Sequence, residues 1–233
     1  MVDHTVRSFD ADLETLDRHI SEMGGIAEKM LSDAMDALAT MNIELAQKVI
    51  ETDLRMDALQ RTVEDLAVRT IARRQPVAID LRDTVGVIRI SADLERIGDQ
   101  AKNIAKRAAK IAGEARLPRA IVGLKSMHDM AANQLKDVLD AFAQRDPDAA
   151  KAVWRRDAEL DALEDAVFRD LLTFMMEDPR NITFCTHLLF CAKNLERVGD
   201  HATNIAETVY YIVTAQNLPG EERPRGYDAT ALA

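Results

Sequence analysis

Two segments of the chain carry oxygen-bearing side chains at a spacing that could bind a cation. DLERIGDQAKNIAK (93–106) returns 101 positions later as NLERVGDHATNIAE (194–207), and each copy holds Glu, Asp and Asn four residues apart: Glu95, Asp99 and Asn103, then Glu196, Asp200 and Asn204. Residues four apart lie on one face of an α-helix. Carboxylate and amide oxygens are ligands for hard and borderline cations. Each segment therefore predicts a row of candidate metal ligands along one helix.

A second acidic pair accompanies each row, in an earlier helix of the same half: Asp53 and Asp57, then Asp157 and Asp161. On a helical wheel the rows lie opposite the apolar stripe of their own helix, whereas these pairs flank theirs. We therefore expect the site on the outer surface, with a row and a pair meeting along the groove between two helices. Four carboxylates that converge without a cation repel one another. Either metal binds there, or the carboxyl pKa values rise, or the side chains do not converge.

A solvated helix face is the competing interpretation of the acidic rows, because Lys and Arg residues are interspersed with the acids. Neighbouring positions differ between the two copies, as Lys102 and Thr203 do, yet the rows are identical. Gly98 and Gly199 lie beside the rows, and each costs about 1 kcal/mol relative to Ala inside a helix. Close approach of a neighbouring helix or a ligand is therefore expected there. His201 is a weaker candidate ligand, since the first copy has Gln at that place.

Composition narrows the class of protein. The chain has 233 residues and a formal net charge of −10 without a dense Lys/Arg patch, which argues against nucleic acids and anionic membranes as partners. It shows no apolar leader and no run of about 18 apolar residues, so we expect a cytoplasmic protein with no direct membrane insertion. Cys185 and Cys191 fit neither a disulfide framework nor a zinc motif and are expected to be buried.

The chain reads as an internal duplication of a helical unit. LSDAMDAL (31–38) matches LKDVLDAF (135–142), and DLRMDAL (53–59) matches DAELDAL (157–163), both 104 positions apart. Few Gly, Pro and aromatic residues occur, which favours long helices. The prediction is an all-α fold of six long helices in two tandem three-helix bundles. Residues 1–115 form the first bundle, 116–216 the second, and 217–233 a disordered tail.

Residues that typically start or end a helix divide each half into three segments. Asn42 is expected to cap the second helix, and Gln75-Pro76 to end it. In the second half, Asp146-Pro147 predicts a capped start for the fifth helix, and Asp178-Pro179 predicts the break before the sixth.

These segments resemble the PhoU family of phosphate-uptake regulators. The resemblance rests on RQPVAIDLR (74–82), DLERIGDQAKNIA, LLTFMMEDPRNI (171–182) and NLERVGDHATNIAE, and it extends over about residues 5–216. It implies tandem three-helix bundles with pseudo-twofold symmetry. It also implies metal ions, iron or zinc in some relatives, at the four acidic motifs Asp53/Asp57, Glu95/Asp99, Asp157/Asp161 and Glu196/Asp200. The oxygen donors alone leave magnesium and manganese open.

The resemblance further implies a regulatory role that involves no catalysis. Family members are cytoplasmic negative regulators of phosphate uptake and phosphate-starvation signalling. They act between the ATPase of the phosphate ABC transporter and a phosphate-sensing histidine kinase, and they are commonly homodimers. The sequence agrees in that it has no Gly-rich phosphate loop and no nucleophile with its base. Two alternatives stay open, a surface metal-dependent phosphohydrolase and a purely structural helical scaffold.

Overall fold

The computed structural model describes residues 2–114 and 118–218, with side chains from residue 11 onward. The first bundle contains α1 (Val2–Thr40), α2 (Ile43–Arg74) and α3 (Ala78–Ile111). The second contains α4 (Pro118–Gln144), α5 (Pro147–Arg155), α6 (Asp157–Glu177), a 3₁₀ turn (Pro179–Asn181) and α7 (Ile182–Thr214). These ranges contain no strand, and the predicted all-α fold of two tandem three-helix bundles is confirmed. Of the predicted tail, residues 219–233 lie outside the described part of the chain.

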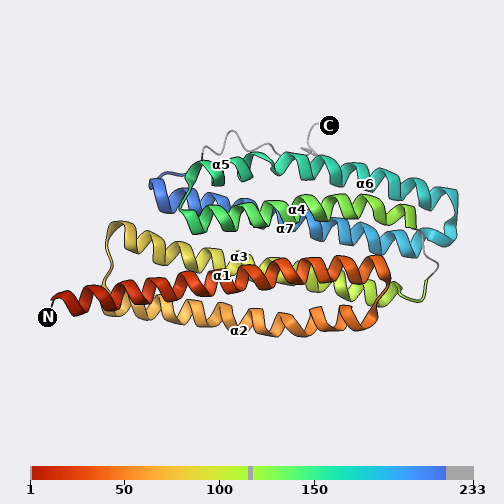
Figure 1. Ribbon diagram of the computed structural model, residues 1–233. Helices are drawn as coiled ribbons and strands as arrows, with labels where there is room; N and C mark the ends of the chain where they lie inside the picture. Colours follow the sequence, from red (N-terminus) through yellow and green to blue (C-terminus); the bar gives the residue numbers. More distant parts are fainter. Residues whose placement is uncertain (1, 115–117, 219–233) are drawn as a thin grey trace.

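The two bundles lie one on the other along their length (Figure 1). α3 packs against α7 and α1 packs against α4, so the last helix of each half lies at the interface. α3 and α7 run antiparallel, because Gly86 of α3 lies against Ile212 of α7 while Asp93 contacts His201. Antiparallel packing of two equivalent helices is the arrangement that a pseudo-twofold axis between the halves produces.

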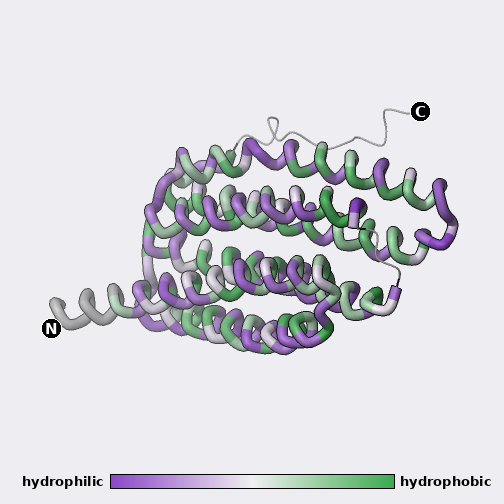
Figure 2. Tube along the Cα trace, turned by 45° about the vertical axis from the view of Figure 1, so that its right-hand side comes forward, coloured by the Kyte–Doolittle hydropathy of each residue, from purple (hydrophilic) through white to green (hydrophobic). Residues whose placement is uncertain are grey.

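The apolar stripes predicted for the third helix of each half form the core. Each member is 1% exposed or less: Ile90, Leu94, Ile97, Ala101, Ile104 and Ala108 in α3, and Leu195, Val198, Ala202, Ile205 and Val209 in α7. Figure 2 shows hydrophobic and hydrophilic residues alternating around the helices, as amphipathic helices require. Cys185 and Cys191 are buried with free thiols, as predicted. None of the described helices is both long and apolar enough to cross a membrane.

Helix starts follow the predicted cap residues. Asn42 accepts a hydrogen bond from the Leu45 amide at the start of α2, at 3.0 Å. Asp146 accepts from the amides of Asp148 and Ala149 at the start of α5. Such side chains satisfy backbone donors that the first turn of a helix leaves unpaired. Local sequence therefore sets these helix starts.

The prediction of one continuous fifth helix is wrong, because this segment is divided at Arg156 into α5 and α6. The Arg156 amide donates to the Val153 carbonyl at 3.0 Å, which tightens the chain there. Gln134 of α4 is 1% exposed and donates from Nε2 to the Arg156 carbonyl at 3.1 Å. A buried side chain from another helix thus stabilises the break, and Asp157 becomes the first residue of α6.

Candidate functional site

The first acidic cluster forms where α2 crosses Gly98 of α3. A Cβ at this position would lie 3.3 Å from Met56 Cγ, so the missing side chain lets Met56 pack directly on α3. Asp53 and Asp57 flank Met56 in the sequence and reach the acidic row of α3 together with it. The close helix approach expected at the glycine is present.

The carboxylates of this first acidic cluster, Asp53, Asp57, Glu95 and Asp99, act on one another through space. Burial raises the pKa of Asp53, and although Lys102 lowers it, the charges of Asp57 and Asp99 raise it further. Burial likewise raises the pKa of Glu95, with the charge of Asp99 as the next cause. Asp53 is only 4% exposed, as expected for a pair beside the apolar stripe. Glu95 and Asp99 of the row are 17% and 24% exposed, so the row lies in the groove, deeper than the outer surface expected for it.

Lys102 supplies a positive charge inside the first acidic cluster. Its Nζ donates to Asp53 Oδ2 at 2.6 Å and to Asp99 Oδ1 at 2.5 Å, and so joins α2 to α3. Burial acts to lower the pKa of Lys102, but its hydrogen bonds to both carboxylates outweigh burial and raise that pKa above its ordinary value. In the sequence Lys102 is notable only as a position that differs between the halves. Its role as a bridge emerges only once α2 is placed beside α3.

The second acidic cluster forms in the same way where α6 crosses α7, and it comprises Asp157, Asp161, Glu196 and Asp200. A Cβ on Gly199 would overlap Leu160 Cδ2, so this crossing is closer still. Asp157 is 5% exposed and accepts a hydrogen bond from the Thr203 hydroxyl at 3.1 Å. Thr203 occupies the position that Lys102 has in the first half.

Glu164 and Lys193 join the second acidic cluster without having been predicted. Lys193 Nζ lies 2.8 Å from Glu196 Oε1, and the charges of Glu164 and Asp200 also act on it. Burial raises the pKa of Glu164; Lys193 lowers it, and nearby acids including Asp161 raise it further. Glu164 lies three residues beyond Asp161, on the same helix face, and this spacing is the signal that could have identified it.

The two asparagines of the acidic rows extend into neighbouring regions. Asn204 donates from Nδ2 to Asp93 Oδ1 at 3.3 Å, and His201 Nδ1 lies 2.9 Å from the same oxygen. These contacts join α7 to α3 across the bundle interface. Asn103 lines a hollow of about 410 Å³ between α2 and α3, whose walls include Lys106 and Lys110. The described contacts of Asn204 and His201 are therefore with Asp93 of the other bundle and not with the second acidic cluster, and Asn103 lines the hollow.

The donor chemistry of both clusters fits a cation, but neither cluster is a preformed metal centre. Among the side chains that the structure describes, no group of three or more His, Cys, Asp or Glu is arranged to hold a metal ion. One buried carboxylate oxygen in each cluster, Asp53 Oδ1 and Glu196 Oε2, has no hydrogen-bond partner within the described residues. Buried polar oxygens are rarely left in that state, so each could accept a cation. Lys102 already lies between two acids of the first cluster, whereas Lys193 pairs with an acid of its own helix.

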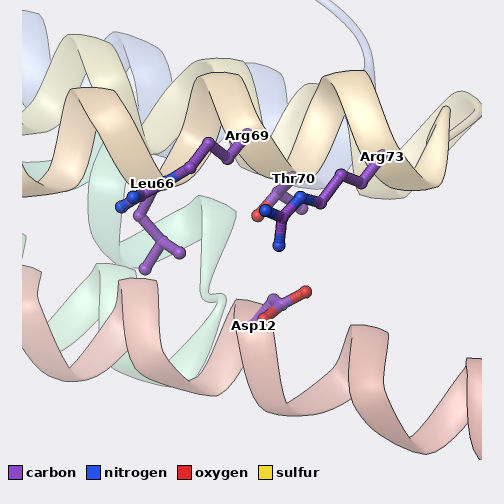
Figure 3. Close-up of a pocket in the computed structure, with 5 residues that line it drawn as sticks. All are labelled: Asp12, Leu66, Arg69, Thr70 and Arg73. Carbon is purple, nitrogen blue, oxygen red and sulfur yellow. The ribbon is translucent and has the colours of Figure 1, made fainter.

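A smaller hollow lies between α1 and α2, about three helical turns beyond Asp57 along α2. Arg69, Thr70 and Arg73 of α2 line its volume of about 140 Å³ together with Asp12 of α1 (Figure 3). Figure 3 shows the Arg73 side chain extending towards Asp12. The hollow holds none of the predicted site residues.

Comparison with known proteins assigns the family. A family model described as the PhoU domain matches residues 20–108 and again residues 124–209, one copy in each bundle. The chain belongs to the PhoU family. The two PhoU domains contain one acidic cluster each and coincide with the internal duplication.

PhoU relatives match over nearly the whole chain. The phosphate-specific transport system accessory protein PhoU homolog of Rhizobium meliloti is 53% identical over 223 residues, covering 95% of this chain and 93% of the relative. The homolog of the same name from Caulobacter vibrioides is 47% identical and covers 97% of each chain. The crystal structure of PhoU from Pseudomonas aeruginosa matches with a TM-score of 0.86 at 39% identity, covering 89% of this chain and 100% of that one. Sequence and fold thus agree on the PhoU assignment.

Proposed function

We propose that the protein is a cytoplasmic accessory regulator of phosphate uptake, which acts by binding partners and not by catalytic turnover. The observation that carries the proposal is an acidic cluster at the equivalent place in each of two PhoU domains. Relatives at 53% and 47% identity bear the name phosphate-specific transport system accessory protein, which supports the assignment to phosphate transport.

The partners proposed are the ATPase of the phosphate ABC transporter and the phosphate-sensing histidine kinase, between which the protein acts as an adaptor and negative regulator. The duplication supports this arrangement, because two quasi-equivalent acidic faces give one chain a face for each of two partners. The net charge of −10 favours partner surfaces that carry positive charge, since complementary potentials speed association and fix its register. A homodimer would carry two copies of each acidic face.

The acidic clusters are proposed to bind divalent or trivalent metal, with iron or zinc favoured by the family resemblance. A bound cation would offset the mutual repulsion of the carboxylates and present positive charge to an anion such as phosphate. Asp53 and Asp99 in the first cluster and Glu196 and Asp200 in the second would hold it. Asp53 and Asp99 also join α2 to α3 through Lys102, so occupancy of the first cluster would be coupled to the surface that a partner meets.

The proposal is tested by measuring metal content and affinity for the purified transporter ATPase in a variant with Asp99→Ala and Asp200→Ala. Removing one ligand from each cluster is expected to abolish metal binding and to weaken ATPase binding by about tenfold or more. The matched control is Asp140→Ala with Asp170→Ala, which changes the net charge equally at exposed positions outside both clusters. Unchanged metal content and ATPase affinity in the cluster variant would contradict the proposal. Metal-dependent phosphoester hydrolysis by the purified protein, lost in that variant, would favour the hydrolase instead.

A further inference from the structure

A buried hydroxyl group lies at the smaller hollow between α1 and α2. Thr70, which lines this hollow, is 2% exposed, and its Oγ1 has no hydrogen-bond partner within the described residues. Thr52 and Thr62 of the same helix donate to the carbonyls four residues earlier, at 2.8 and 2.9 Å. Figure 3 shows the Thr70 oxygen pointing towards α1, where Asp12 lies. Since buried polar groups are nearly always paired, this hydroxyl is a donor that a ligand in the hollow could use.

Positive charge outweighs negative charge in the hollow. Arg74 Nε and Nη2 each lie 3.4 Å from Asp12 Oδ2, so the carboxylate that lines the hollow already has a counter-charge. Arg69 and Arg73 also line the hollow, and neither forms an ion pair with another described residue. Arg69 donates from Nε to the backbone carbonyl of Asp65 at 3.1 Å. Two guanidinium groups therefore remain for a ligand, and that ligand is an anion.

The size and the donors of the hollow fit a small oxyanion. Its volume of about 140 Å³ is below the roughly 300–1,000 Å³ of pockets that enclose larger ligands. Guanidinium groups bind the oxygens of phosphate through paired N–H donors. Arg69 and Arg73 are exposed, so their side chains can turn towards an ion. The carbonyl end of α2 opposes an anion with about half an elementary charge, against the two full charges of the arginines.

Asp12 determines which oxyanion fits. A carboxylate accepts a hydrogen bond but repels an anion that has no proton to donate. Inorganic phosphate keeps at least one proton at neutral pH, so it can donate to the Asp12 Oδ1 that Arg74 leaves unused. Sulfate has no such proton, and a phosphomonoester has lost most of its second proton at pH 7, because its second pKa is about 6. A carboxylate among arginines therefore favours inorganic phosphate over both.

The second bundle lacks this set of donors. The positions 104 residues beyond the two arginines and Thr70 hold Thr173, Phe174 and Glu177, which carry no positive charge. The hollow is therefore a feature of the first bundle and not a consequence of the duplication. One site per chain is expected.

We propose that the hollow between α1 and α2 binds one inorganic phosphate ion. Arg69, Arg73 and Thr70 donate to its oxygens, and Asp12 accepts its proton. The site is distinct from both acidic clusters and requires neither metal nor a partner, so the inference goes beyond the proposed function. It gives a regulator of phosphate uptake a direct contact with the ion itself, at a place where α1 meets α2.

Calorimetric titration of sodium phosphate into chelator-treated protein at pH 7.5 tests the site without metal at the acidic clusters. The natural sequence should bind one ion per chain. Arg73→Gln should weaken the affinity by about tenfold or more, because it removes a charged donor. Arg61→Gln is the matched control and should leave the affinity unchanged. It removes another exposed arginine of α2 that forms no ion pair with a described residue and lies outside the hollow.

Two further variants test the hydroxyl and the carboxylate. Thr70→Val keeps the shape of the buried side chain and should weaken phosphate binding by about fivefold, since it removes one donor. The natural protein should prefer phosphate to sulfate and to phosphoserine by about tenfold or more. Asp12→Asn should lose this preference, because an amide can donate to a fully ionised oxygen.

Thermal unfolding gives a second readout. Phosphate should raise the melting temperature of the natural protein and of Arg61→Gln but not that of Arg73→Gln, because a ligand stabilises only the state that binds it. Absence of phosphate binding by the natural protein, equal binding by Arg73→Gln, or binding that requires added metal would overturn the inference. Tighter binding of phosphoserine than of phosphate would overturn it as well, in favour of a phosphorylated partner. None of these outcomes bears on ATPase binding by the cluster variant, which tests the proposed function separately.

Discussion

Glu95 lies in a groove where burial and the charge of Asp99 disfavour its ionised form, so its folded pKa is raised above the unfolded value. A carboxyl group of this kind contributes stability below its unfolded pKa, and that contribution is lost as the pH rises through its folded pKa. At neutral pH the ionised side chain therefore destabilises the fold. The same reasoning applies to Asp53, where Lys102 offsets part of the effect.

We predict that Glu95→Gln stabilises the protein in chelator at pH 8 by about 0.5–1 kcal/mol, because the amide carries no charge towards Asp99. The advantage should shrink as the pH falls through the raised pKa of Glu95. Chemical denaturation at a series of pH values from about 8 to 5 measures it. Glu14→Gln, at an exposed position of α1, is the control and should show no such trend. A destabilised Glu95→Gln at pH 8 would mean that the Glu95 charge is favourably paired.

Helix crossings determine where the acidic residues lie, and the two glycines differ in how tightly they are covered. A Cβ on Gly98 would lie 3.3 Å from Met56 Cγ, at the end of a flexible side chain. A Cβ on Gly199 would overlap Leu160 Cδ2 and lie 3.1 Å from Gln134 Oε1. Alanine gains about 1 kcal/mol of helix propensity at either position, but overpacking costs about 1–3 kcal/mol.

We therefore predict that Gly98→Ala is close to neutral, whereas Gly199→Ala lowers the free energy of unfolding by about 1–2 kcal/mol. Urea denaturation compares the two variants under one condition. Gly25→Ala is the matched control: nothing lies within 4 Å of a Cβ there, so it should stabilise the helix. Equal losses at Gly98 and Gly199 would show that the two crossings are equally tight.

The helices and their acidic faces could be predicted from sequence because their causes are local. Cap residues such as Asn42 and Asp146 act within one turn, and a helical wheel needs only the sequence of its own helix. The break at Arg156 could not be predicted, because a buried amide of α4 stabilises it. The bridge made by Lys102 and the contact of Asn204 with α3 depend in the same way on a neighbouring helix. Such contacts follow from packing, which the wheel of one helix does not contain.

At the scale of the whole molecule, polar side chains join the bundles beyond the apolar contact of α3 and α7. Arg145, which follows α4, donates from Nη2 to Asp17 Oδ1 at 3.0 Å and lies 3.3 Å from Asp83 Oδ1. A residue of the second half thereby bridges α1 and α3 of the first. Towards the other end of the interface, the Arg107 guanidinium of α3 lies 3.9 Å from the ring centroid of Phe190 in α7. The two PhoU domains are thus coupled at both ends of their interface.

We predict that Arg145→Gln lowers the free energy of unfolding by about 1–2 kcal/mol, a value reduced for the partial exposure of the pair. Burial raises the pKa of Asp83, and Arg145 is the main group that opposes this rise. Without Arg145 the ionised Asp83 is disfavoured further, so the deficit should shrink as the pH falls and Asp83 becomes protonated. Adding Asp83→Asn should recover part of the loss at neutral pH, because it removes the uncompensated charge.

Calorimetry distinguishes a local loss in Arg145→Gln from a loss of coupling between the bundles. If Arg145 couples them, the variant should unfold over a broader range than the natural sequence, with a calorimetric enthalpy that exceeds the van't Hoff value. Arg18→Gln is the control, because Arg18 donates only to Thr15 of its own helix in the described contacts. Matching transitions in the two variants would locate the coupling in the apolar face of α3 and α7 alone. A broader transition in Arg145→Gln would mean that one PhoU domain can unfold before the other does.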